Sequence, residues 1–432
     1  MTDTLLAAQR LQFTDRPRAE VIVKGFVRDL FDLDITSVEL RPSSVSLNSI
    51  NGLMFLRDGR ALFFKTHTEP DSRIDEYYNA KLLKSAGYPV VDPVFGSTRS
   101  GRQLLVYEVI DAPTLFDEAW RAEQGSTATL AALAEAQHRL DRTLARVQFS
   151  TLEWQEADEA AGAPVHQLFF HRLMGRRLDE FLNREHTYEA GNRMVSVEQI
   201  RRLEWNINGQ RYSTNLDHLI DEAAKILDPQ KPGPSIVGHG DGHNGNAFFQ
   251  GSERCPKYFD PAFAGRHNPL LDFVKPLYHN VFAMWMYFPD LKHQETTLAS
   301  TVEDGRICVE HDYSLHPVRQ MFLWSKFSNV IVPMVSELRN RGWLRDDWRR
   351  YVKSALLCCP LLTVNFGDRS KYSAKIAWLA LSSAVEMGAE SGGRRSIIDQ
   401  FLDEVELQTS GLSSERPVRV VPAPTAPREQ VS

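Results

Sequence analysis

A short, glycine-rich polar segment between two apolar runs limits the possible folds of this chain more than any other part of the sequence. The segment spans Gly238 to Asn246 and reads Gly-His-Gly-Asp-Gly-His-Asn-Gly-Asn. An apolar run at 235–237 precedes it, and a second run at 247–249 leads into a turn at 251–256 and an extended stretch at 257–260. Two short strands joined by a turn form an antiparallel hairpin. We therefore expect a β-hairpin with the polar segment at its open end.

The expected pairing of this hairpin brings two oxygen ligands together. If Gln250 pairs with Lys257, then Ala247 pairs with Asp260, and Asn246 meets Asp260 at the open end. An amide oxygen beside a carboxylate is a hard oxygen site that Mg²⁺ accepts, with phosphate oxygens and water completing the octahedron. The sequence therefore predicts Asn246 and Asp260 as Mg²⁺ ligands.

The spacing within the polar segment points to a reaction. His239 is followed by Asp241 two positions later and by Asn246 five positions after that. This is the order of a kinase catalytic loop, in which the aspartate accepts a hydroxyl proton and the asparagine holds a metal ion. We therefore expect Asp241 to be the catalytic base.

The first hundred residues predict a small sheet with helices. Residues 1–33 have helical spacing, and strands are expected at 34–40, 53–56, 61–65 and 103–110, with a hairpin turn at 57–60. Lys65 ends one strand, and Glu76 lies in an amphipathic helix expected at 74–85. Kinases pair a strand lysine with a helix glutamate to aim the ammonium at the nucleotide phosphates. Alone, each charge is more simply interpreted as a surface residue, but the Asp241 segment downstream favours the pair.

The rest of the chain has mostly helical spacing. Helices are expected at 119–124, 127–149, 165–181, 197–206 and 215–227, and helical spacing continues to about Thr409. The tail at 411–432 is rich in Ser, Pro and Arg and is predicted to be disordered. We expect an N-terminal lobe at 1–110, a helical C-terminal lobe at 111–410 with the catalytic loop at 236–273, and the tail.

The segment 238–246, together with Asp260-Pro261 and Asp272, resembles the aminoglycoside phosphotransferase and choline kinase-like family of small-molecule kinases. The match is tight over 235–273 and looser over 34–111. The resemblance implies an α+β, bilobal protein kinase-like fold. Its N-terminal lobe has an antiparallel sheet plus a helix, and its larger C-terminal lobe is mostly helical and carries the catalytic β-hairpin.

The resemblance also implies roles for individual residues. Asp241 is the base, Asn246 and Asp260 hold Mg²⁺, and Lys65 with Glu76 positions the phosphates. His239 and Asp272 brace the loop, while the backbone at the lobe hinge, from Tyr107 to Val109, offers hydrogen bonds to adenine. The polar stretch 41–52 is not the Gly-x-Gly-x-x-Gly loop of protein kinases, although Ser49 could donate to phosphates. Asp260 is followed by Pro-Ala, which speaks against a regulated protein kinase.

Composition excludes several other classes of protein. The formal net charge of −6 over 432 residues argues against nucleic-acid binding as the main task. The apolar runs are too short to span a membrane, and no secretion signal is visible. The four cysteines lack zinc-like spacing, and Cys358 and Cys359 lie in an apolar run. These features predict a cytoplasmic protein that acts without membrane or nucleic-acid partners.

The favoured hypothesis is transfer of the γ-phosphoryl group of ATP or GTP to a hydroxyl of a small molecule (antibiotic, sugar or metabolite), with Mg²⁺. One alternative is a metallophosphoesterase that uses His239, Asp241 and His243 as metal ligands. Another is a kinase-fold binding module without catalysis. Charges between 275 and 350 are balanced, so no acidic excess favours a polycationic substrate. Arg172, Arg176 and Arg177, on a predicted helix, could face an anionic substrate, but a solvated helix face is the simpler interpretation. The acceptor and the oligomeric state stay open.

Overall fold

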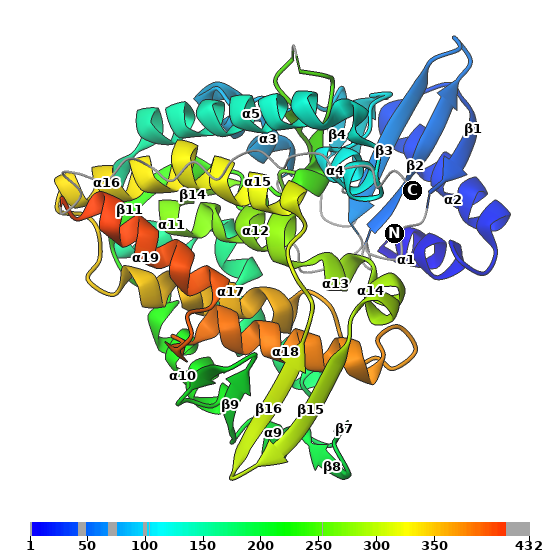
Figure 1. Ribbon diagram of the computed structural model, residues 1–432. Coiled ribbons are helices and arrows are strands. Elements are labelled where there is room, and N and C mark those ends of the chain that lie inside the picture. The colour runs from blue at the N-terminus through cyan, green and yellow to red at the C-terminus, as the bar shows by residue number, and fades with distance from the viewer. Residues whose placement is uncertain are drawn as a thin grey trace, which may run out of the picture.

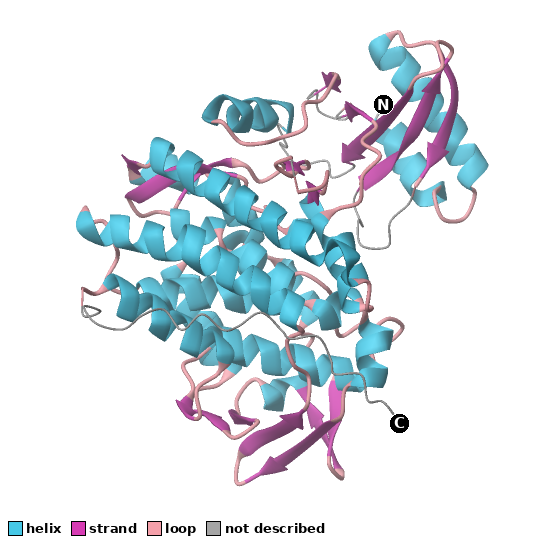
Figure 2. Ribbon diagram, turned by 45° about the horizontal axis from the view of Figure 1, so that its top comes forward, coloured by secondary structure: helices cyan, strands magenta, loops and turns pink. Residues whose placement is uncertain are grey.

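The chain folds into a small N-terminal sheet with helices and a larger, mostly helical part (Figures 1 and 2). The computed structural model describes residues 2–41, 49–67, 76–97, 102, 104–252 and 254–411. Among these, the side chains at positions 2, 3, 6, 49, 67 and 76–78 lie outside the description. The predicted α+β fold, with an antiparallel N-terminal sheet and a larger helical part, is confirmed.

The N-terminal sheet has five strands in the order β1-β2-β3-β5-β4, and every neighbouring pair is antiparallel. The strands are β1 (Ile35–Leu40), β2 (Ser49–Leu56), β3 (Ala61–His67), β4 (Phe95–Ser97) and β5 (Leu104–Glu108). Gly59 has a φ of 88° in the turn between β2 and β3, a conformation that favours glycine. All four predicted strands exist, and β4 is an addition that sequence reasoning missed.

One face of this sheet packs on two helices and the other face stays available for the site. Side chains alternate across a strand, so Leu62 and Phe64 of β3 are buried on one face while Lys65 lies on the other. The buried face packs against α1 (Thr2–Leu11) and α2 (Arg16–Phe31). The single helical region predicted at 1–33 is thus two helices, and the second begins where Asp15 accepts a hydrogen bond from the backbone N–H of Arg18.

Buried apolar residues form two separate cores. The smaller one runs from Leu5 to Val106 and joins α1 and α2 to the sheet. The larger one runs from Leu83 to Val405 and includes Leu83 of α3 (Glu76–Ala86), which packs against β11 and β14. The predicted lobe limits at 110 and 410 remain a prediction, since α3 lies within 1–110 but packs on the larger core.

The larger part is built on buried helices. Cys358 and Cys359 are buried in α17, as expected for small core residues. The helices are α4 (Leu115–Glu123), α5 (Leu130–Thr151), α6 (Ala157–Ala161), α7 (Phe170–Met174), α8 (Arg176–Phe181), α9 (Val197–Ile200), α10 (Leu216–Ile226), α11 (Pro269–Asp272), α12 (Val274–Leu277), α13 (Met284–Tyr287), α14 (Pro289–Glu295), α15 (Pro317–Lys326), α16 (Val332–Asn340), α17 (Trp348–Leu362), α18 (Ala374–Gly388) and α19 (Ile397–Thr409). Short 3₁₀ segments are η1 (Thr127–Thr129), η2 (Pro164–Leu168) and η3 (Asn244–Asn246), and π-helical turns are η4 (Tyr278–Phe282) and η5 (Phe327–Ile331).

Two helix predictions were wrong in part. The helix expected at 165–181 is broken into η2, α7 and α8, with an extended residue at Gly175. The helix expected at 197–206 ends after one turn, and the chain continues as β9. The remaining strands are β6 (Glu153–Gln155), β7 (Thr187–Ala190), β8 (Arg193–Ser196), β9 (Glu204–Ile207), β10 (Gln210–Tyr212), β11 (Gly233–Gly238), β12 (Ala247–Phe248), β13 (Lys257–Tyr258), β14 (Gly265–His267), β15 (Leu298–Glu303), β16 (Arg306–His311) and β17 (Gly392–Gly393).

Sequence reasoning also missed a second five-stranded sheet, at the end of the molecule away from the N-terminal sheet (Figure 2). Its order is β15-β16-β9-β10-β17, and β16 pairs with β9 in parallel. Its two tight turns have positive φ at both central residues: Asn208 (50°) and Gly209 (76°), and Asp304 (47°) and Gly305 (74°). Asn-Gly and Asp-Gly pairs between alternating residues are hairpin signals, so this sheet was readable in the sequence.

Two further predictions concern the C-terminal tail and membrane-spanning segments. The predicted disordered tail lies outside the described residues apart from Gly411. Over the described ranges, no helix combines the length and the apolar character that crossing a membrane requires.

Candidate active site

The predicted β-hairpin around the polar segment is present. β11 leads into the loop, η3 follows it, and β12 pairs with β13 in antiparallel fashion. The predicted register was wrong by two positions, since Ala247 pairs with Tyr258 instead of Asp260. A shift of two keeps each side chain on its expected face. The backbone N–H of Phe259 donates to the carbonyl of Asn246 at 3.0 Å, so Asp260 follows directly after the residue opposite Asn246.

The register differs because the hairpin pairs with other segments. The N–H of Phe249 donates to the carbonyl of Pro113 at 2.7 Å, in the segment that follows β5, rather than extending β12. On the other side, the N–H of Tyr258 donates to Pro89 at 2.7 Å and its carbonyl accepts from Val91 at 2.8 Å. The hairpin is therefore held between two segments that flank strands of the N-terminal sheet.

The loop around Asp241 is folded tightly on its own backbone. The carbonyl of Asp241 accepts from the N–H of His243 at 2.8 Å and from the side-chain amide of Asn246 at 3.0 Å. Gly240 has a φ of 76°, and a Cβ there would lie 2.5 Å from the carbonyl oxygen of Phe263, so only glycine fits. The loop thereby presents the half-buried Asp241 side chain on a fixed backbone.

Asp272 supports this loop through contacts of both its carboxylate oxygens. Its Oδ1 accepts from the N–H of Gly240 at 2.9 Å and lies 3.0 Å from His267 Nε2, and its Oδ2 accepts from Gln148 at 2.8 Å. Burial by itself raises the pKa of Asp272, but the contacts with His267 and Gly240 outweigh it, and the pKa lies below its usual value. A carboxylate that stays ionised in the interior fixes three partners at once.

His239 also contacts the loop's surroundings. Its Nε2 lies 3.1 Å from the carbonyl oxygen of Phe259, next to Asp260, and its ring lies 4.9 Å from that of Tyr258. The hydroxyl of Tyr258 donates to the carbonyl of Gly242 at 3.1 Å. These contacts tie the loop to β13.

Lys65 and Asp260 join the sheet to the hairpin. Their side chains form an ion pair and are 12% and 27% exposed. Asp260 has a φ of 57°, so the backbone leaves the strand sharply at this residue. Of the other predicted nucleotide contacts, Tyr107 lies within β5 opposite Phe63, and Val109 follows β5 with an exposed side chain. The side chains of Glu76 and Ser49 lie outside the described residues.

A buried polar network behind the loop was not predicted. Asn244 of the loop exchanges two hydrogen bonds with Asn280, at 2.7 and 3.0 Å, and its amide donates to Gln137 at 3.0 Å. Gln137 in turn donates to Asp141, which pairs with Lys326 of α15. An asparagine at 280 inside the apolar run 270–288 is the sequence signal that could have revealed this contact, because buried polar groups require partners.

The family of the chain follows from a match over this region. The model of the phosphotransferase enzyme family, abbreviated APH, matches residues 53–290, which is more than half of the chain. The chain belongs to this family. The matched range begins in β2 and includes Lys65, the Asp241 loop and Asp260. It confirms the predicted family and the predicted class of enzyme, a small-molecule kinase.

Solved structures similar to this APH family member include three enzymes. Macrolide 2'-phosphotransferase MphH from Brachybacterium faecium is 12% identical, with a TM-score of 0.35 over 83% of this chain and 96% of its own. Ethanolamine kinase from Plasmodium vivax is 10% identical, with a TM-score of 0.43 over 83% and 85%. A thermostable mutant of aminoglycoside phosphotransferase APH(4)-Ia, solved with ADP and hygromycin B, is 10% identical, with a TM-score of 0.43 over 85% and 99%. No curated protein matches the chain.

The geometry gives no support to the metallophosphoesterase alternative. Nε2 of His239 faces the Phe259 carbonyl, and Nδ1 of His243 accepts from the N–H of Gly245 at 3.1 Å. In the part of the chain that the structure describes, no three His, Cys, Asp or Glu side chains are grouped so that they could hold a metal ion. An amide–carboxylate pair such as Asn246 and Asp260 is a different type of site.

The donors at 246 and 260 fit the chemistry of Mg²⁺. Because the Asn246 NH₂ group donates to the Asp241 carbonyl, its oxygen is the atom left to act as a ligand. Asp260 adds a carboxylate, and both belong to the hard oxygen class that Mg²⁺ prefers.

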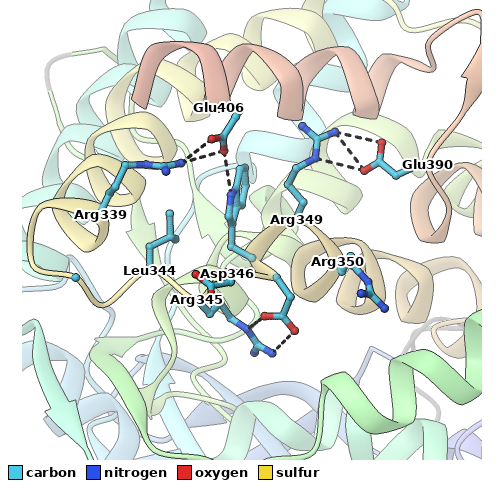
Figure 3. Close-up of a pocket in the computed structure, with 11 residues that line it drawn as sticks. Arg339, Leu344, Arg345, Asp346, Arg349, Arg350, Glu390 and Glu406 are labelled. Atoms are coloured by element: carbon cyan, nitrogen blue, oxygen red, sulfur yellow. Dashed lines mark hydrogen bonds and ion pairs between the residues drawn. The ribbon is translucent and has the colours of Figure 1, made fainter. Parts of the chain in front are cut away.

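A pocket of about 670 Å³ lies elsewhere in this APH family member, between α16, the start of α17 and α19 (Figure 3). Its arginines have carboxylate partners: Arg339 with Glu406, Arg345 with Asp347, Arg349 with Glu390 and Arg350 with Glu222. Its positive charge is balanced within the protein, and none of its lining residues belongs to the catalytic loop.

Proposed function

We propose that this protein transfers the γ-phosphoryl group of ATP or GTP to a hydroxyl of a small molecule in the presence of Mg²⁺. The observation that supports this most is the ion pair between Lys65 and Asp260. It joins a cation on the open face of the sheet to the carboxylate beside Asn246 and the Asp241 loop. A phosphate-binding cation, two metal ligands and a base are the parts that phosphoryl transfer requires.

Asp241 acts as the base in this proposal. It accepts the proton of the acceptor hydroxyl while that oxygen forms its bond to the γ-phosphorus, and the bond from phosphorus to the β-phosphate oxygen breaks to release ADP or GDP. The reaction depends on alignment more than on covalent chemistry. The hydrogen bonds that Asp272 and His239 make around the loop supply that alignment by fixing the Asp241 backbone.

Asn246 and Asp260 are the proposed Mg²⁺ ligands. When bound, the ion would neutralise phosphate charge and orient the transferred group. Lys65, with Glu76, is proposed to position the phosphates, Ser49 to donate to them, and the backbone from Tyr107 to Val109 to bind the base of the nucleotide. We further propose a cytoplasmic enzyme without nucleic-acid or membrane partners.

Replacement of the base tests this function. We expect Asp241→Asn to lower ADP formation by about 100-fold or more, because general base catalysis contributes about 10²–10⁴-fold. Binding of ATP with Mg²⁺, measured by titration calorimetry, should stay within about threefold, since the change keeps the shape of the side chain. The exposed Asp58→Asn serves as the matched control and should change neither quantity. Unchanged ADP formation in Asp241→Asn across a panel of hydroxylated metabolites and antibiotics would reject the proposal.

A further inference from the structure

Lys275 is a buried cation without a carboxylate partner. It lies in α12 and is 2% exposed. Its Nζ donates to Oγ1 of Thr363 at 3.2 Å and lies 3.3 Å from Nε2 of His279. Over the described residues it forms no ion pair with an aspartate or glutamate. A buried ammonium usually has a carboxylate partner, because its desolvation is costly otherwise.

Two other buried lysines of the same chain follow the usual rule. Lys353, which is 1% exposed, pairs with Asp399, and Lys326, which is 5% exposed, pairs with Asp141. Lys275 differs from both in its missing partner. Burial lowers the pKa of Lys275, while Cys359 and, to a smaller extent, the charge of Asp241 act in the opposite direction and favour the ammonium form. Lys275 therefore lies within electrostatic reach of the catalytic loop.

The groups around Lys275 add no negative charge of their own. Nδ1 of His279 lies 2.7 Å from the hydroxyl of Tyr287, and its ring lies 5.2 Å from that of His243 in the catalytic loop. Burial lowers the pKa of both histidines, so both are neutral near pH 7. Arg172 of α7 is half-buried and lies 5.9 Å from the ring of Phe263. Its positive charge lowers the pKa of Lys275 further.

The carboxylates that act on Lys275 and His243 are Asp241 and Asp260. In the proposed function, one of these binds the proton of the acceptor and the other binds Mg²⁺. Once both are used in this way, the charge of Lys275 is left without a counter-ion near the base. Thr363, which contacts Lys275, and His243 and Tyr287, which contact its neighbour His279, are all partly exposed.

We propose that Lys275 binds an anionic group of the acceptor, so that the substrate is a hydroxylated carboxylate or phosphate ester. The proposal rests on the proposed function and defines its substrate class. The anionic group supplies the counter-ion that Lys275 lacks, and its attachment to the alcohol places the hydroxyl next to Asp241. A polycationic acceptor would place like charges beside Lys275, which is unfavourable.

Matched pairs of alcohols test the substrate class. ADP formation is measured with glycerate, glycerol 3-phosphate and glycerol, and with gluconate and sorbitol, for wild type, Lys275→Met, Lys275→Arg and the exposed control Lys231→Met. We expect kcat/KM of wild type to favour the acidic member. In Lys275→Met the ratio of kcat/KM for the acidic member to kcat/KM for the neutral member should fall about 10-fold to 100-fold, the effect of one charged hydrogen bond. Lys275→Arg and Lys231→Met should have the same ratio as wild type.

The comparison of glycerate with glycerol 3-phosphate distinguishes a carboxylate from a phosphate group. Equal turnover of acidic and neutral members, or an unchanged ratio in Lys275→Met, would overturn the proposal. ADP formation that depends on Asp241 but favours neutral or cationic alcohols would reject the substrate class alone. Absence of ATP binding would instead reject the proposed function.

A binding measurement decides the case in which no alcohol of the panel is turned over. Thermal unfolding is followed in sodium sulfate and in sodium chloride of equal ionic strength. Sulfate stabilises proteins in general, so the informative quantity is the difference between variants. We expect a larger sulfate-dependent rise in Tm for wild type and Lys275→Arg than for Lys275→Met. Equal rises in all three proteins would show that no anion binds at Lys275 and would overturn the proposal.

Discussion

At the scale of single residues, Gly238 shows how closely the loop is packed on its support. A Cβ at this position would lie 2.5 Å from both Asp272 Oδ1 and His267 Nε2, which contact each other and fix the loop. We expect Gly238→Ala to lower stability by about 1–3 kcal/mol, because overpacking displaces both partners. ADP formation should fall as well, since Asp272 accepts from the Gly240 backbone.

A second glycine provides the control for this prediction. Gly25 lies inside α2, and a methyl group added there would meet no atom within 4 Å, so Gly25→Ala should raise stability by about 0.5–1 kcal/mol. Urea unfolding of both variants checks the expected loss of stability in Gly238→Ala and the expected gain in Gly25→Ala. A Gly238→Ala protein as stable and as active as wild type would contradict the tight contact.

His166 gives a prediction of pH dependence. It is 6% exposed, its Nε2 lies 2.9 Å from the carbonyl of Ala160, and burial lowers its pKa to about 4. The folded state therefore keeps His166 neutral below pH 6.5, where the unfolded chain binds a proton. Above pH 6.5 His166 is neutral in both states and does not affect the free energy of unfolding. As the pH falls from 6.5 toward 4, proton binding to the unfolded chain lowers that free energy.

The expected loss between pH 7 and pH 4 is about 3 kcal/mol for this residue. Urea unfolding at several pH values, for wild type and His166→Gln, isolates its share from that of other groups. The stability of His166→Gln should fall less steeply over this range. Parallel curves for the two proteins would show that His166 does not titrate in this way.

At the scale of elements, a π-helical turn positions the residues behind the loop. Asn280 and His279 lie in η4, and Asn280 exchanges two hydrogen bonds with Asn244. The carbonyl of Asn280 accepts from Arg319 of α15, which forms a buried ion pair with Glu123 of α4. π-helical turns occur often at functional sites, because they redirect side chains within a helix. Here the turn aims Asn280 at the loop and His279 at Lys275.

Asn280→Ala tests this arrangement. The change leaves the N–H and the side-chain oxygen of Asn244 without their partner, so we expect a stability loss of about 1–3 kcal/mol and a lower kcat. Binding of ATP should change little, because Asn280 contacts the loop from the side of α15. A double-mutant cycle with Asn244→Ala measures the coupling, and fully additive effects would contradict the contact.

At the scale of the whole molecule, the two separate cores predict two regions of independent stability. Phe64 is fully buried in the smaller core and Leu379 is 2% exposed in the larger one. We expect Phe64→Ala, with a cost of about 3–5 kcal/mol, to speed hydrogen exchange in β1 to β3 and β5 while α17 and α18 keep their protection. Leu379→Ala should do the reverse. Uniformly faster exchange in either variant would indicate one cooperative unit.

Local patterns led to the prediction of a catalytic loop at 238–246 from spacing alone. The order of His239, Asp241 and Asn246 lies within nine residues, and turns and alternating strands also depend on neighbours in sequence. For this reason the four N-terminal strands and the existence of the β12–β13 hairpin were predicted correctly. The second sheet carried equally local Asn-Gly and Asp-Gly signals that the helical interpretation overlooked.

The register of the hairpin and the contacts that support the loop could not be predicted from residue spacing. Pro89 and Pro113 compete for the backbone of the hairpin, and Gln148 reaches Asp272 across 124 positions. Such contacts depend on which buried surfaces meet, and the spacing of residues does not encode that directly. The broken helix at 165–181 has the same origin, since helical spacing persists through a break.

The amino-acid sequence by itself determined the family, the N-terminal strands and the position of the hairpin, because these follow from spacing and local preferences. Only the tertiary structure decided that Lys65 meets Asp260, that Asp272 contacts Gly240, and that Lys275 lies buried beside the loop without a carboxylate. The charge environment of a side chain is set by everything packed around it. For a lysine in an apolar run, only the folded structure shows whether a carboxylate partner is present.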